Sequence, residues 1–342
     1  MKFESPSKIF ADESSRKGLP AWTYNNEELT ELEMEQVFLS NWLFVGHVSD
    51  MPRTGDYQCL TMGNERAVVV RDQQGELRAF HNLCSHRASR IVSEDKGHCG
   101  KAFICPFHGW SYNLDGSVKN IPRESAFPDI DKKQLGLKTL DCEVWHGLIF
   151  VRFGGDGPSV AQQFAEVGLS RAWGSFEGRK HKSEQVQNYV DALPEESYLP
   201  ESHRHLWVYL GTFPGFVLTL FPDQIEVYQI YSAGPQKSVM AGVTYALADS
   251  RKSMHKARKF NRDINMEVGD EDIRLIEWAA QGMRSSAFEQ VVLSDLELGV
   301  AAFQNQLREN LPVVSLPQAP PQGSLAKVNA SMLTKAKVAA VR

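Results

Sequence analysis

The spacing of apolar residues near the start of the chain is that of an amphipathic helix. In residues 25–42, Leu29, Leu32, Val37 and Phe38 recur near helical intervals. Two asparagines that can cap a helix and an acidic first turn precede them. The pattern predicts an N-terminal helical segment, which we assign to residues 1–41.

From residue 44 to residue 153 the pattern changes to short β-rich pieces separated by turns. Strand-like runs at residues 67–70 and 77–80 flank a turn at residues 72–75, and a second turn signal stands at residues 113–116. This alternation predicts a small antiparallel β domain. The glycine-rich stretch that follows it at residues 154–158 places the end of this domain at residue 155.

The second half of the chain combines strand-like and helical patterns. Three apolar runs at residues 216–221, 225–231 and 239–247 precede a helical pattern that extends from Ile273 to Ala287. We therefore predict an α+β domain over residues 156–312, with an antiparallel sheet and a long C-terminal helix. The fold class of the whole chain is α+β.

The last thirty residues look different from the rest of the chain. Residues 313–342 contain Pro317, Pro320 and Pro321, and four basic side chains without an acidic one. This composition predicts a mobile basic tail.

Composition narrows the classes of protein. The 342 residues are 42% hydrophobic and 23% charged, with 37 basic against 42 acidic side chains and a net charge of -5. These values exclude disordered, collagenous and membrane-spanning chains, and the length favours two domains. Because no dense Lys/Arg block stands in the body of the chain, neither nucleic acid nor an anionic membrane is an expected partner.

The cysteines and the N-terminus indicate a compartment. Five cysteines scattered over a large chain do not form the even set of a disulfide framework, which favours a reducing environment. The first residues lack the apolar stretch of a signal peptide, and no run reaches the ~18 apolar residues of a membrane helix. We expect a cytoplasmic protein.

Two Cys/His pairs within the β domain carry the clearest chemistry. Cys84 and His86 stand on one short segment, and Cys105 and His108 on another, with 18 residues between the two pairs. Two thiolates and two imidazoles at this spacing can close one metal site. Cys59, Cys99, Cys142 and His81 have no partner at ligand spacing, so a structural role is expected for each.

Two kinds of metal centre are compatible with these pairs. Zinc fingers usually combine a cysteine pair with a histidine pair, whereas here each segment has one of each. A [2Fe–2S] cluster in which two cysteines hold one iron and two histidines hold the other suits the mixed arrangement better. A zinc-stabilised β domain fused to a ligand-binding α+β domain stays the alternative.

The sequence around the pairs resembles the Rieske domain of ring-hydroxylating oxygenase α subunits. The resemblance is carried by residues 84–90 (CSHRASR), 105–112 (CPFHGWSY), 114–116 (LDG) and 121–122 (IP). It implies a Rieske [2Fe–2S] cluster held by Cys84, His86, Cys105 and His108. It also implies electrons from a separate reductase, a trimer, and a mononuclear iron in the second domain that activates dioxygen.

The resemblance weakens where the mononuclear iron ligands should stand. One alignment places Glu195 at the carboxylate that links subunits, Tyr198 at the first histidine ligand and His203 at the second. A second alignment, which we favour, leaves the whole two-histidine segment missing. His205, two residues beyond His203, could form a makeshift pair with it on a strand.

The carboxylate ligand of that iron has a better match. Residues 269–277 and 281–285 resemble the last helix of the family, and Asp272 falls at the metal-binding acid. The alternative is an ordinary carboxylate near a helix N-terminus, stabilised by free amides and the helix dipole.

These observations leave two functional hypotheses. The first is a Rieske-type non-haem iron oxygenase α-like subunit that hydroxylates or demethylates a small organic substrate with dioxygen. The second is a degenerate electron-transfer or assembly subunit without a working mononuclear iron. No Gly-x-Gly-x-x-Gly follows a strand, so a separate NAD(P)H-dependent reductase or ferredoxin is the expected partner. We expect a homo-trimer or a mixed oligomer with a related chain.

Overall fold

The computed structural model describes residues 16–340 with the exception of residues 167–169, 176–183, 195–198 and 205. The chain divides into two compact units, one of Met34–Glu166 and one that joins Met1–Glu33 to Val167–Arg342. Among the described residues, no helix combines the length and the apolar character needed to cross a bilayer.

The unit of residues 34–166 is built on a seven-stranded antiparallel sheet with the order β2-β11-β10-β5-β4-β3-β6. A buried apolar stripe runs through its centre, where Val68, Val69, Val70, Phe80 and Ile149 are at most 1% exposed. The strands are β2 (Leu43–His47), β3 (Asp56–Met62), β4 (Glu65–Arg71), β5 (Leu77–His81), β6 (Lys96–His98), β10 (Thr139–Trp145) and β11 (Leu148–Arg152).

A second, three-stranded sheet with the order β7-β8-β9 completes this unit. Its strands are β7 (Ala102–Ile104), β8 (Ser111–Asn113) and β9 (Val118–Asn120). Short helices fill the connections: η3 (Met34–Phe38), η4 (Val48–Asp50), η5 (Glu124–Ala126), η6 (Lys132–Gln134) and α3 (Val160–Glu166). Phe164 of α3 stacks on Trp145 with the ring centroids 4.4 Å apart, so this unit extends beyond the glycine-rich stretch.

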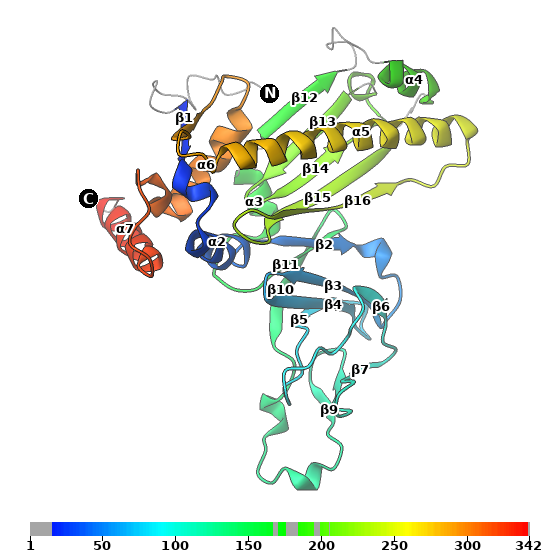
Figure 1. Cartoon of the computed structure of the whole chain (residues 1–342). Helices are drawn as coiled ribbons and strands as arrows, with labels where there is room; N and C mark the ends of the chain where they lie inside the picture. Colours follow the sequence, from blue (N-terminus) through cyan, green and yellow to red (C-terminus); the bar gives the residue numbers. More distant parts are fainter. Residues whose placement is uncertain (1–15, 167–169, 176–183, 195–198, 205, 341–342) are drawn as a thin grey trace. The chain divides into compact units, whose positions relative to one another are not determined.

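The other unit is built on a five-stranded antiparallel sheet with the order β12-β13-β14-β15-β16, and the long helix α5 lies across one face of it (Figure 1). Tyr189, Trp207, Phe221, Ala257 and Ile264 form the apolar cluster between helices and sheet. The elements are β12 (Ser170–Ser175), α4 (Glu184–Ala192), η7 (Glu201–His203), β13 (Leu206–Thr212), β14 (Phe216–Leu220), β15 (Gln224–Ser232), β16 (Ser238–Ala246) and α5 (Lys252–Gly282).

Residues from both ends of the chain complete this unit. Strand β1 (Lys17–Pro20) pairs antiparallel with β17 (Gln290–Val292). The remaining elements are η2 (Ala21–Tyr24), α2 (Glu27–Glu33), α6 (Leu298–Asn310), η8 (Pro312–Ser315) and α7 (Leu325–Ala340). The expected N-terminal helix is confirmed as α2, and the Asn26 side chain caps it by accepting from the Leu29 N–H at 2.8 Å.

The predicted strands are confirmed within a residue or two at each end, because period-2 patterning and turn residues act locally. The long helix is displaced from its expected position. It begins at Lys252 rather than at Ile273 and ends at Gly282. Its buried face consists of Met254, Ala257, Asn261 and Ile264, whereas Ile273 is 54% exposed.

Two expectations about the ends of the chain are wrong. Residues 313–340 do not form a mobile tail: Val313, Val314 and Leu325 are at most 2% exposed, and α7 is a regular helix. The N-terminal segment assigned to residues 1–41 is not a unit of its own either: in its described part, β1 pairs with a strand about 270 positions further along the chain, and residues from Met34 onward belong to the other unit. Both contacts join distant parts of the sequence, which no local pattern reports.

Candidate functional site

The two Cys/His pairs lie on two loops with the same backbone pattern. The Ala88 N–H donates to the Cys84 carbonyl at 2.9 Å, and the Gly109 N–H donates to the Cys105 carbonyl at 3.0 Å. Each cysteine N–H also closes its loop, onto the carbonyl of the residue five positions further on. Ala88 and Gly109, with φ of 57° and 74°, both have the left-handed conformation that reverses the chain.

The loops bring the four side chains together. The first loop connects β5 and β6, and the second connects β7 and β8. Cys84 and Cys105 are each 2% exposed and belong to one apolar cluster with Trp110, Tyr112 and Ile121. The rings of His86 and His108 lie 4.7 Å apart between centroids, so both loops contribute one thiol and one imidazole to the same place.

Aromatic side chains hold the histidines. The His86 ring stacks on Trp110 with 5.0 Å between centroids and 2° between planes, and Phe127 meets its edge. His108 contacts Phe107 and is exposed, whereas His86 is half-buried. The cysteines therefore lie inside and the histidines towards the surface.

The electrostatics of the site suit a metal centre. Burial, together with the nearby His108 and Arg87, lowers the pKa of His86, which keeps the ring neutral with a lone pair to donate. Its Nδ1 is buried and has no hydrogen-bond partner among the described residues. Burial also raises the pKa of the Cys84 thiol, so the thiolate needs a cation beside it.

The donor atoms of the four side chains suit a [2Fe–2S] cluster. Two buried sulfur donors, two imidazoles nearer the surface and an unpartnered buried ring nitrogen are the donor set that a Rieske cluster requires. The four residues fit such a cluster. The five cysteines of the chain are free thiols in the structure.

The candidate ligands of the second iron do not come together among the described residues. His203 is exposed in the short helix η7, and Asp272 is exposed in the interior of α5 rather than near its N-terminus. Glu195, Tyr198 and His205 lie outside the described residues. Within the described ranges, no group of three His, Cys, Asp or Glu side chains is placed to hold one metal ion. His203 and Asp272, the two described candidates, do not by themselves form a two-histidine, one-carboxylate site.

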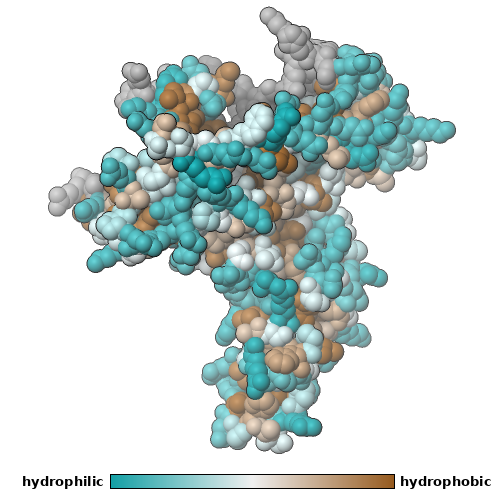
Figure 2. Space-filling model, in the orientation of Figure 1, coloured by the Kyte–Doolittle hydropathy of each residue, from teal (hydrophilic) through white to brown (hydrophobic). Residues whose placement is uncertain are grey.

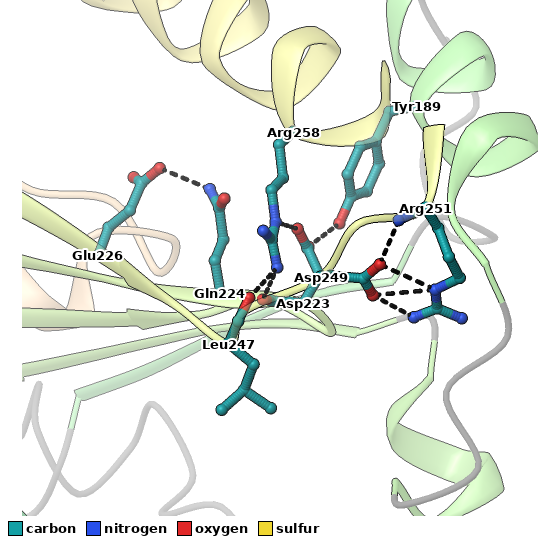
Figure 3. Close-up of polar contacts among 8 residues, drawn as sticks. All are labelled: Tyr189, Asp223, Gln224, Glu226, Leu247, Asp249, Arg251 and Arg258. Atoms are coloured by element: carbon teal, nitrogen blue, oxygen red, sulfur yellow. Dashed lines mark hydrogen bonds and ion pairs between the residues drawn. The ribbon is translucent and has the colours of Figure 1, made fainter. Parts of the chain in front are cut away.

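Beneath α5 lies a buried ion pair that sequence reasoning did not find (Figure 3). Asp223, 3% exposed, accepts from the Tyr189 hydroxyl at 2.9 Å and from the Arg258 Nε at 3.3 Å. Arg258 also donates to the backbone carbonyl of Leu247 at 3.0 Å. Burial raises the pKa of Asp223, and the two donors act against that shift. These contacts tie α4 and α5 to the end of the sheet.

Next to this ion pair is a cavity of about 540 Å³, and most of the residues that line it are polar or charged. Gln224, Glu226 and Tyr228 alternate along β15 and line it from the sheet, since side chains two apart in a strand share a face. His255, Lys259 and Arg262 are among the α5 residues that line the other side. Two features of the sequence could have indicated this cavity. One is the polar residues at alternate positions of a strand, and the other is the basic residues three and four positions apart on a helix.

Comparison with protein families gives the class of this chain. Residues 41–154 match the family model described as Rieske [2Fe-2S] domain, and residues 146–312 match the ring hydroxylating alpha subunit (catalytic domain). The first match selects the Rieske cluster over zinc. Together the two matches span residues 41–312, so the chain contains a Rieske [2Fe–2S] domain followed by a ring-hydroxylating alpha subunit catalytic domain. Its first domain implies a [2Fe–2S] cluster, and its second domain implies a mononuclear iron.

Individual relatives differ in how much of the chain they match. The alpha subunit of biphenyl 2,3-dioxygenase from Rhodococcus jostii is 38% identical over 145 residues, which is 42% of this chain and 31% of that protein. The oxygenase subunit of glycine betaine monooxygenase from Pseudomonas aeruginosa is 34% identical over 269 residues, which is 78% of this chain and 61% of that protein. The chain thus spans less than two thirds of the length of these curated relatives.

Solved structures share the fold. The quaternary ammonium Rieske monooxygenase CntA in complex with L-carnitine superposes with a TM-score of 0.69 at 18% identity, covering 91% of this chain and 99% of that one. Naphthalene 1,2-dioxygenase with bound indole gives a TM-score of 0.63 at 18% identity, covering 97% and 99%. At this identity the likeness establishes the fold alone.

Proposed function

We propose that this chain is the alpha-like subunit of a Rieske-type non-haem iron oxygenase that hydroxylates or demethylates a small organic substrate with dioxygen. The observation that carries the proposal is the pair of equivalent loops that brings Cys84, His86, Cys105 and His108 together. They stand in a chain whose second half matches a ring-hydroxylating catalytic domain.

In this proposal Cys84 and Cys105 would hold one iron of a bound cluster, and His86 and His108 would hold the other. A bound cluster supplies one-electron transfer. The chain's own contribution is to exclude water with Trp110 and Phe127 and to fix the ring of His86 by stacking. The Tyr112 hydroxyl, 3.2 Å from the Cys84 sulfur, adds a polar contact inside an apolar cluster.

A separate NAD(P)H-dependent reductase or ferredoxin supplies the electrons. Leu83, Ile104 and Phe107 are 45%, 65% and 58% exposed beside the ligand loops. Figure 2 shows hydrophobic surface at the end of this unit that carries β7 and β9. An exposed apolar surface next to His108 is suited to transient contact with an electron-donor protein.

His203 and Asp272 stay candidate ligands of the second iron, and Glu195 stays the candidate carboxylate link between subunits, in a homo-trimer or a mixed oligomer. The described residues alone do not assemble a ligand set for this iron. We propose that the protein functions in the reducing environment of the cytoplasm, where its cysteines can stay unpaired with one another.

Metal analysis of protein purified without air, combined with an EPR spectrum after dithionite reduction, tests the proposal. We expect a Rieske signal and about three irons per chain, of which one is removable by a mild chelator. A Rieske signal with about two irons would instead make the chain an electron-transfer or assembly subunit. A colourless protein without a signal would contradict both.

A matched pair of histidine variants tests the cluster ligands. His108→Ala should abolish the visible absorption and the EPR signal, because the outer iron loses one of its two protein ligands. His98→Ala is the control, since His98 lies in the same unit and bonds Asp56. Equal loss in both variants, or retention in both, would contradict the assignment.

A further inference from the structure

Helix α5 separates its charges along its length. Residues 252–262 contain five Lys and Arg side chains and no acidic one, whereas residues 263–277 contain six Asp and Glu side chains and a single arginine. The helix dipole favours the opposite order, and α5 has no acidic residue in its first turn and no basic residue in its last. The stability of the helix itself therefore does not explain this arrangement.

Four of these charges lie on one line along the outer side of α5. Lys252 and Lys259 are seven positions apart, Asp270 and Glu277 are also seven apart, and eleven positions separate Lys259 from Asp270. Seven and eleven residues are close to two and three turns of an α-helix, so the four side chains share one side of it. All four are exposed, and within the described part of the chain none of them has an ion-pair partner.

This line of charges is complementary to itself. The midpoint between Lys259 and Asp270 falls between residues 264 and 265, and the midpoint between Lys252 and Glu277 falls at the same place. Two copies of α5 that run antiparallel about a two-fold axis at this point therefore bring each lysine opposite a carboxylate of the other copy. The symmetry gives four such pairs, whereas a parallel arrangement in register places like charges together.

Apolar side chains lie beside the charged line. Met266 and Ile273 follow Lys259 by seven and fourteen positions, and Ile276 is one turn further on. Their exposed fractions are 61%, 54% and 63%. The face of α5 that packs on its own sheet is the opposite one, and Figure 1 shows the helix on the outside of that sheet. Exposed apolar side chains that adjoin one another indicate a surface for binding another protein.

The charged pairs and the apolar side chains support each other in such a contact. A single exposed ion pair contributes little, because water screens it and two long side chains lose freedom. Here four pairs lie on two preformed helices, so less freedom is lost for each of them. The aliphatic stems of the lysines can also cover the methionine and isoleucine side chains while their ammonium groups stay in water.

The order of the charges restricts the partner. A uniformly basic surface is repelled by residues 252–262, and a uniformly acidic one, such as nucleic acid, is repelled by residues 263–277. A matching surface must carry acidic groups and then basic groups in the reverse order. The antiparallel α5 of another copy of the chain has that order.

We infer that α5 binds the α5 helix of a second copy of this chain, antiparallel and about a two-fold axis between residues 264 and 265. Lys252 and Lys259 of each copy lie against Glu277 and Asp270 of the other. Asp272 is two positions after Asp270 and so lies on the opposite side of the helix, which leaves this candidate iron ligand outside the contact. The inference does not depend on the proposed oxygenase function.

Sedimentation equilibrium with two matched variants tests the contact. Asp270→Lys and Glu271→Lys change neighbouring exposed residues in the same way, but only Asp270 lies on the charged line. We expect the unaltered chain to form a species of twice the mass of its unpaired form. Asp270→Lys should weaken this pairing at least about tenfold, or about 1.4 kcal/mol, and Glu271→Lys should change it much less. The absence of pairing in the unaltered chain, or equal pairing in both variants, would overturn the inference.

A pair of complementary variants separates charge matching from damage to the fold. Lys252→Glu with Lys259→Glu makes the line entirely acidic, and Asp270→Lys with Glu277→Lys makes it entirely basic. Neither double variant should pair with itself, because like charges meet. An equimolar mixture of the two should pair again, since each lysine then faces a carboxylate. Self-pairing of either double variant, or no pairing in the mixture, would contradict the antiparallel contact.

Discussion

The Tyr112 hydroxyl lies 3.2 Å from the Cys84 sulfur and also accepts from the Ser85 N–H at 3.1 Å. As a cluster ligand Cys84 would carry no proton on its sulfur, so the Tyr112 hydroxyl would be the donor in this contact. Tyr112 is fully buried, so this contact is shielded from water. A hydrogen bond to a cluster sulfur stabilises the more negative, reduced state.

Removal of that hydroxyl should therefore make the cluster harder to reduce. Tyr112→Phe should lower the reduction potential by on the order of 50 mV, which corresponds to ~1 kcal/mol for a one-electron couple. Protein-film voltammetry measures the shift. Tyr57→Phe, in the same apolar cluster, is the matched control and should leave the potential unchanged.

Substitutions at Ala88 and Gly109, the left-handed residues of the two ligand loops, should change thermal stability in opposite directions. Ala88 has φ of 57°, which costs roughly 1–2 kcal/mol for a residue with a Cβ, so Ala88→Gly should raise the thermal stability of the unit. Gly109→Ala, at φ of 74° and with Pro122 3.4 Å from the new Cβ, should lower it by a similar amount. Differential scanning calorimetry of both variants checks the signs, and a shift in the same direction for both would contradict the loop geometry.

The segment that follows η8 should resist proteolysis. Val314 is fully buried, and the Val313 N–H donates to the Asn329 side chain at 3.2 Å. Val314→Ala should cost roughly 1–3 kcal/mol of unfolding free energy by leaving a cavity. It should also expose residues 325–340 to trypsin. Rapid cleavage of that segment in the unaltered chain would show that it is not packed.

Acid should weaken the β unit through Asp56. Burial acts to raise the pKa of this carboxyl, but hydrogen bonds from His98 and Arg53 prevail and hold its pKa below the ordinary value. A carboxyl with a depressed pKa stabilises the fold above its unfolded pKa of about 4, and this contribution is lost as the pH falls through the folded pKa. Asp56→Asn should lower stability at pH 7 and flatten its decline below pH 4, as measured by urea unfolding. An unchanged slope would contradict the linkage.

The sequence by itself determined the features that depend on neighbouring residues. The strands of the β unit follow from alternation and turn residues, and the two Cys/His loops follow from spacings of two and three positions, since each loop closes on itself within six residues. The candidate ligands Cys84, His86, Cys105 and His108 therefore follow from the sequence alone. Asp272 was predicted as an iron ligand from the family resemblance alone. The helix that contains it is present, but it begins at Lys252 rather than at Ile273.

Only the tertiary structure decided the features that join distant segments. The pairing of β1 with β17, the folded segment after residue 312 and the start of α5 depend on apolar contacts between residues far apart in sequence. The cavity beneath α5 is of the same kind: Glu226 and Asn265 are 39 positions apart, and neither alone suggests a site. Burial takes Glu226 out of water and surrounds it with hydrogen-bond donors, and a sequence pattern does not contain that change in surroundings.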